Sequence, residues 1–85
     1  MSLFTDHVIP GDHGRIFSTN ANKEEDLLKI KNAILSISGI KDVIANMDVF
    51  PKEFTIYTTK LVKIEEIENE VKLLGFHVIP KKELY

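Results

Sequence analysis

Residues 27–58, LLKIKNAILSISGIKDVIANMDVFPKEFTIYT, contain the change of hydrophobic period that decides the fold. In the first part, apolar residues recur at steps of three and four, which predicts a helix with one buried stripe. After Gly39, a residue that readily adopts the positive φ found at helix ends, apolar residues alternate with others, which predicts strands. We expect a helix over 23–38 and strands over 42–50 and 54–58. The short link at Pro51 implies an antiparallel hairpin.

Outward from this stretch, the chain adds one element before it and two after it. Gly14–Thr19 has the β-branched and aromatic residues of a strand. Asn22 followed by Glu25 resembles a capping box at the start of the first helix. An apolar stripe ending before Gly75 predicts a second helix over 63–74, and a last strand is expected over 76–79. The order strand, helix, strand, strand, helix, strand is typical of the ferredoxin-like α+β sandwich, a four-stranded antiparallel sheet with two helices on one face.

The composition limits the classes of protein to which the chain can belong. Eighty-five residues allow one small domain. We place it at 14–80, between an N-terminal arm or extra edge element at 1–13 and a charged tail at 81–85. The absence of cysteine excludes thiol nucleophiles, disulfides and thiolate metal sites. A net charge of −2 argues against nucleic-acid binding, which needs a basic field. No apolar run is long enough to span a bilayer, so we expect a cytoplasmic protein with no membrane insertion.

Several short phrases, in order along residues 15–80, are similar to those of the heavy-metal-associated domain family, which includes metallochaperones and modules of metal-transporting ATPases. Four of the matching phrases are Phe17-Ser-Thr-Asn-Ala-Asn-Lys23, Ile37-Ser-Gly-Ile-Lys-Asp-Val43, Phe54-Thr-Ile56 and Leu74-Gly-Phe76. The resemblance implies the same ferredoxin-like fold. It also implies protein contacts at the first loop and the sheet edge, as in the transfer complexes of the family.

The position of the family's metal ligands is where this sequence departs from the pattern. The family binds soft ions such as Cu(I) through a Cys-x-x-Cys motif, and the resemblance places the two cysteines at Lys23 and Asp26. Soft ions prefer thiolates, so we assign no copper ligand here. The intervening Glu24 and Glu25, with Asp26, fan out around a helix turn, which favours a solvated helix N-terminus over a hard-metal site.

The histidines are the other candidate metal ligands. His-Val-Ile-Pro occurs at 7–10 and again at 77–80. If the arm adds a strand to the sheet, the two copies approach each other, and His7, His13, Asp12 and His77 become weak candidate ligands for a divalent ion such as Zn(II), Cu(II) or Ni(II). The alternative interpretation is surface histidines with a half-buried His77. No cofactor is otherwise expected.

No enzymatic pattern is visible. Acylphosphatases share the element order, but they need an arginine in a glycine-rich first loop, and the single arginine, Arg15, precedes that position. No phosphate-binding or dinucleotide-binding glycine motif occurs. We therefore predict that the chain is not an enzyme.

Three functional hypotheses follow. The first is a heavy-metal-associated domain without thiolates, acting as a protein-interaction or metal-homeostasis accessory module, with a partner or a second copy bound at a sheet edge or the first loop. The second is a metal-binding protein that uses histidine and carboxylate ligands. The third is a small-ligand regulatory module whose pocket wall is the loop 19–22.

Overall fold

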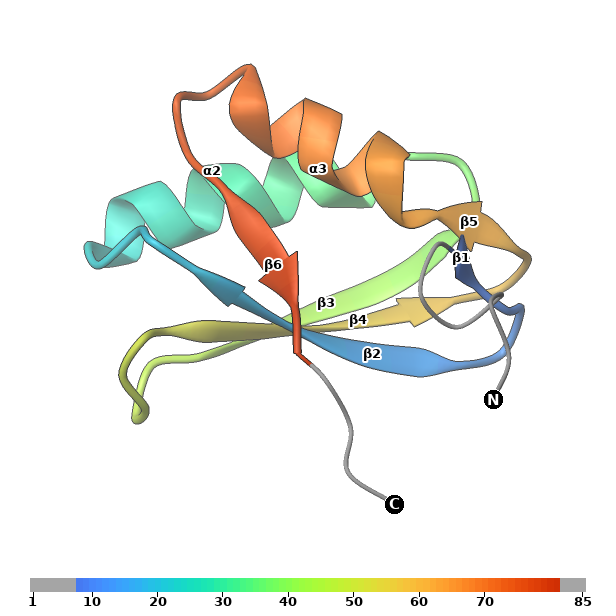
Figure 1. Cartoon of the computed structure of the whole chain (residues 1–85), viewed down its shortest axis with the longest axis horizontal. Coiled ribbons are helices and arrows are strands. Elements are labelled where there is room, and N and C mark those ends of the chain that lie inside the picture. The colour runs from blue at the N-terminus through green and yellow to red at the C-terminus, as the bar shows by residue number, and fades with distance from the viewer. Residues whose placement is uncertain (1–7, 82–85) are drawn as a thin grey trace.

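The computed structural model describes residues 8–81, and its elements follow the predicted order with two short strands added (Figure 1). These elements are β1 (Val8–Ile9), β2 (Gly14–Thr19), α2 (Glu24–Leu35), β3 (Ile40–Asn46), β4 (Glu53–Thr58), β5 (Val62–Lys63), α3 (Ile64–Lys72) and β6 (Val78–Pro80). The predicted bounds of β2 are those observed, and β4 differs from its prediction by one residue.

The main sheet has the order β3-β4-β2-β6, and each neighbouring pair is antiparallel. Both helices lie on the same face of this sheet (Figure 1). The predicted ferredoxin-like α+β sandwich is therefore confirmed. The central strands β2 and β4 place Phe17 opposite Phe54 in the middle of the sheet, and both side chains are fully buried.

The core lies between the helices and the sheet. One face of each strand contributes to it, because side chains alternate across a strand. The predicted apolar stripes of both helices also pack into the core. Its most buried members include Phe17, Ile30, Ile34, Val43, Phe54, Ile56, Ile67 and Val71. The prediction was wrong at Leu74, which is 40% exposed because α3 ends at Lys72 and the chain turns away from the sheet.

The bounds of α2 are narrower than predicted at both ends. At its start, Lys23 is the N-cap residue and no side chain caps the helix, so the capping box expected at Asn22 does not form. At its end, the backbone tightens after Leu35. Ser36 N–H donates to both Asn32 O and Ala33 O, and Ser36 Oγ donates to Ala33 O at 2.6 Å. Local hydrogen bonding thus ends the helix before the apolar pattern does.

The strand predicted over 42–50 also ends early. β3 stops at Asn46, whose Oδ1 accepts a hydrogen bond from Asp48 N–H at 3.1 Å. This side-chain bond starts a turn, as asparagine often does. The last strand is shifted as well, since β6 begins at Val78 and not at the predicted residue 76.

The arm contributes a strand to a different sheet. β1 pairs antiparallel with β5, which precedes α3, and this two-stranded sheet is separate from the main one. The arm is therefore not an added strand of the main sheet, and residues 1–7 lie outside the described part. The turn between β1 and β2 is fixed by the buried side chain of Thr58, whose Oγ1 donates to Pro10 O at 2.5 Å.

Candidate functional site

The loop between β2 and α2 is held in place by two polar side chains. Thr19 Oγ1 donates to His77 O at 2.9 Å, and His77 N–H donates to Asn20 Oδ1 at 2.9 Å. The intervening loop residue Ala21 is buried. These contacts join the loop to the segment between α3 and β6. The loop that precedes α2 is therefore held in one position relative to the sheet.

Lys23 and Asp26 share the first turn of α2. Lys23 is the N-cap, and its carbonyl oxygen accepts a hydrogen bond from Leu27 N–H at 3.0 Å. Asp26 follows three residues later, which places both side chains at the positive end of the helix dipole. The Lys23 side chain is exposed and that of Asp26 is half-buried. The helix start thus carries an ammonium and three successive carboxylates, those of Glu24, Glu25 and Asp26.

This set of donors does not fit a soft metal ion. A protonated ammonium cannot coordinate, and carboxylates suit hard ions. Within residues 8–81, no group of three histidine, aspartate or glutamate side chains is arranged to hold a metal ion. We therefore assign neither Lys23 nor Asp26 as a metal ligand.

The candidate histidine ligands do not converge. His13 lies just before β2, where its N–H contacts Thr58 Oγ1, whereas His77 contacts the residues at the other end of that strand. Six strand residues separate them by about 20 Å, too far for one ion. His77 is exposed, so the prediction of a half-buried side chain was wrong. Asp12 lies beside His13, with φ at 58°. His7 lies outside the described residues, so a site that joins it to His13 stays a prediction.

An apolar pocket of about 380 Å³ lies between the first half of α2 and the edge strand β3. It is lined by Glu24, Glu25, Leu27, Leu28, Lys31 and Ala45. Leu27 forms the floor, being almost fully buried, whereas Leu28 is 56% exposed. In the sequence, Leu28 widens the apolar stripe of the first helix, and the prediction that it is buried with this stripe was wrong. The exposure of Leu28 could have been inferred from its charged neighbours, since Glu24 and Lys31 lie one turn before and one turn after it on the same side of the helix.

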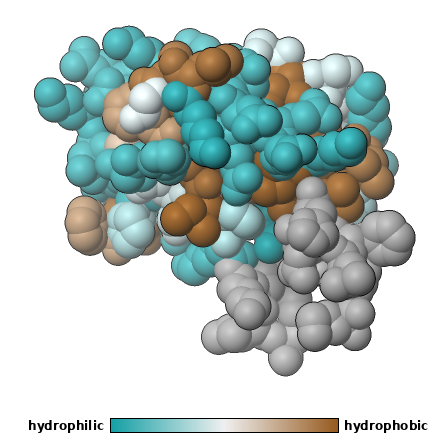
Figure 2. Space-filling view, turned by 45° about the horizontal axis from the view of Figure 1, so that its top comes forward, coloured by the Kyte–Doolittle hydropathy of each residue, from teal (hydrophilic) through white to brown (hydrophobic). Residues whose placement is uncertain are grey.

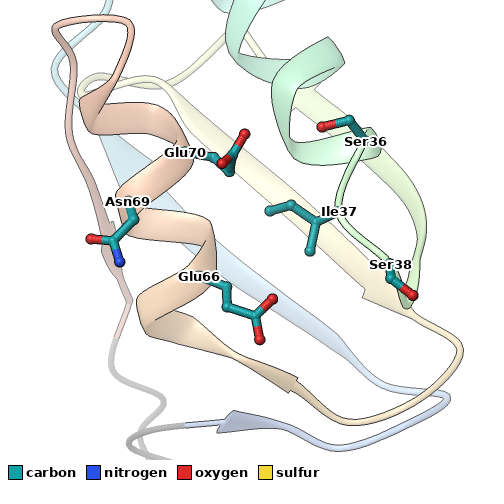
Figure 3. Close-up of a pocket in the computed structure, with 6 residues that line it drawn as sticks. All are labelled: Ser36, Ile37, Ser38, Glu66, Asn69 and Glu70. Carbon is teal, nitrogen blue, oxygen red and sulfur yellow. The ribbon is translucent and has the colours of Figure 1, made fainter.

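A second pocket, of about 370 Å³, lies between the end of α2 and the exposed side of α3 (Figure 3). Ser36, Ile37, Ser38, Glu66, Asn69 and Glu70 line it. Its charge is negative, because two glutamates meet the carbonyl end of α2, where no basic residue occupies the last turn. Neither pocket is lined by the loop 19–22, the predicted wall of a small-ligand site, and that hypothesis gains no support here.

The negative charge of this second pocket predicts a stabilising substitution. Glu70→Lys is expected to raise the free energy of unfolding by about 0.5–1 kcal/mol, because a cation then faces the end of α2 and lies four residues after Glu66. Glu70→Gln should give about half of this gain, since it removes the repulsion without adding an attraction. Urea denaturation measures both. Salt at about 1 M shortens the Debye length to roughly a third of its value at 0.1 M, so a gain by the lysine variant that persists there contradicts the electrostatic explanation.

The face that carries the helices is largely hydrophilic, and hydrophobic side chains form separate patches on it (Figure 2). Among the described residues, no helix has the length and apolar character needed to cross a membrane.

Comparison with known proteins defines the fold further. No protein-family model matches the chain, and no curated protein matches its sequence. Among solved structures, it is similar to the copper(I)-loaded form of the first domain of the human copper chaperone for SOD1, with a TM-score of 0.66. The chain shares the ferredoxin-like fold of that chaperone domain. The match covers 80% of this chain and 90% of the chaperone domain, at 13% identity, so the likeness concerns the fold alone.

Proposed function

We propose that this chain is a non-enzymatic docking domain that derives from the heavy-metal-associated family and binds another protein through the side formed by α2 and β3. The observation that carries the proposal is the pocket at Leu28. A large apolar side chain, 56% exposed, borders a pocket with an apolar floor at the edge of the sheet. Exposed apolar residues around a concave surface are typical of protein-binding sites.

The chemistry of the helix start supports the same interpretation. The positions at which the family carries thiolates hold Lys23 and Asp26, which do not suit Cu(I). The loop before them is nevertheless fixed by Thr19 and Asn20. A rigid loop beside an apolar pocket serves protein recognition without a metal, because preorganised surfaces lose less entropy on binding.

Site-specific photocrosslinking in cells that express the protein tests this proposal. A crosslinking amino acid at position 28 is expected to capture a defined partner, which is then identified and purified. Leu28→Glu should weaken binding of that purified partner at least tenfold in calorimetry, since a carboxylate in the pocket opposes apolar contacts.

Leu73→Glu is the matched control, because Leu73, the C-cap residue of α3, is 80% exposed and does not line the pocket. Its affinity for the partner should stay within twofold of that of the parent chain. Capture from position 73 and not from position 28, or equal effects of the two glutamates, contradicts the proposed surface.

A further inference from the structure

The direction of the backbone groups along β3 shows what kind of segment can bind beside the pocket. Thr58 N–H donates to His13 O at 2.9 Å, and Asp12 N–H donates to Thr58 O at 2.9 Å. The backbone groups of Thr58 therefore point away from β3. Because these groups alternate along a strand, those of Tyr57 and Thr55 point toward β3.

The register then fixes the orientation of β3 itself. Asp42 and Ile44 lie opposite Tyr57 and Thr55, so their backbone groups face β4. The groups of Val43 and Ala45 consequently face outward, where β3 forms the edge of the main sheet. No strand of the described part of the chain lies beyond this edge.

The first half of this edge is closed. The register shifts between Ile40 and Asp42, and such a bulge disrupts pairing with an added strand. Val43 N–H already donates to the carboxylate of the preceding residue, Asp42 Oδ1, at 2.8 Å. Charged side chains on an edge strand oppose unspecific pairing in this way.

The second half of the edge faces the pocket. The outward groups here are Val43 C=O and both backbone groups of Ala45, and Ala45 also lines the pocket with Leu27 and Leu28. Side chains of a strand added here would alternate between the pocket and the opposite face of the sheet, where Ile44 is 49% exposed. The pocket rim carries Glu24, Glu25 and Lys31, an excess of one negative charge.

We propose that the 43–45 edge of β3 binds a short extended segment of another protein by strand addition. One apolar side chain of that segment occupies the pocket at Leu28, and a basic side chain lies beside Glu24 and Glu25. This inference rests on the proposed function and specifies the partner. A second copy of the chain fits less well, because a two-fold axis near Ala45 would bring together the Glu24 and Glu25 side chains of both copies.

A peptide selection tests the inference. The full chain is used to select binders from a displayed library of random short segments, and the strongest binders are synthesised. Isotope-labelled chain is then titrated with each peptide and its amide spectrum recorded. The proposal expects peptides with alternating apolar residues and a lysine or arginine, bound with micromolar affinity, and amide shifts concentrated at 43–46 and at the first turns of α2.

Two controls distinguish strand addition from other modes of binding. Two N-methylated forms of the peptide are compared, one modified at its odd-numbered residues and one at its even-numbered residues. One form should bind at least tenfold more weakly and the other nearly as well as the parent peptide, since only one set of amides pairs with β3. Ala45→Pro in the protein should also weaken binding of the unmodified peptide at least tenfold. It removes an outward N–H without removing a ladder bond to β4, and edge strands tolerate proline for this reason.

The outcomes separate this inference from the proposed function. Binding that is lost in Leu28→Glu but insensitive to N-methylation and to Ala45→Pro overturns strand addition and leaves the docking surface in place. Shifts located elsewhere, or no enriched peptide, overturn strand addition at this edge. If the crosslinking at position 28 also captures no partner, the docking function fails as well. Because N-methylation changes only the peptide, the test stands even if Ala45→Pro does not fold.

Discussion

A Lys23→Cys/Asp26→Cys variant is expected to bind Cu(I) with one-to-one stoichiometry, whereas the parent chain competes poorly with a chromophoric Cu(I) chelator. The two positions share the first turn of α2, three residues apart, and the preceding loop is fixed by Thr19 and His77. A helix N-terminus lowers the pKa of a thiol and so favours the thiolate that soft ions bind. Titration of chelator-bound Cu(I) with each protein measures the difference.

The control for this variant is a cysteine pair with the same spacing in the middle of the helix. Lys29→Cys/Asn32→Cys places two exposed thiols on α2 without the supporting loop or the helix N-terminus. It should compete less well for Cu(I) than the pair at 23 and 26. Equal affinity of the two pairs would show that the loop adds nothing beyond the spacing of the thiols.

The second large effect is expected from Gly39→Ala, which should lower the free energy of unfolding by about 2–4 kcal/mol. Gly39 has φ at +96°, a backbone conformation that costs an alanine about 1–2 kcal/mol. A Cβ at this position would also lie 2.8 Å from both Lys60 Cγ and Val62 Cγ2. The lysine can move, but Val62 is buried in the core, so the contact adds strain.

Gly75→Ala is the matched comparison for this substitution. Gly75 also has a positive φ, at +88°, but within residues 8–81 no atom beyond its chain neighbours lies within 4 Å of an added Cβ. It should therefore lose only the conformational part, about 1–2 kcal/mol. Urea denaturation of the two variants measures both losses. Equal losses would show that the segment around Val62 moves to accommodate the methyl group.

The hydrophobic period of the sequence was sufficient to predict the fold. It identified the buried stripes through Ile30 and Ile67 and the inward faces of the strands, because burial of one face imposes the period. It did not identify the ends of α2 and β3, which depend on individual hydrogen bonds at Ser36 and Asn46. The pairing of β1 with β5 joins residues more than fifty positions apart, and two residues of strand carry too little pattern to reveal it.

The candidate site was predictable only in part. The resemblance to the heavy-metal-associated family implied that Lys23 and Asp26 occupy the positions of its cysteines, and the structure places both residues at the start of α2. The pocket at Leu28 did not follow from the sequence. Whether a leucine beside the main stripe is covered depends on how far α2 extends over the edge strand, which is a property of the packed helix and sheet.

The opposite edge of the main sheet limits how large an assembly can grow. β6 has three residues and ends at Pro80, which has no N–H to offer a further strand. A chain that joined its β3 edge to the β6 edge of the next would need both edges open to continue without end. Pro80 blocks one pairing position of this short edge, which opposes edge-to-edge stacking into a filament. For strand addition at β3 we therefore expect a finite complex with a single partner segment per chain.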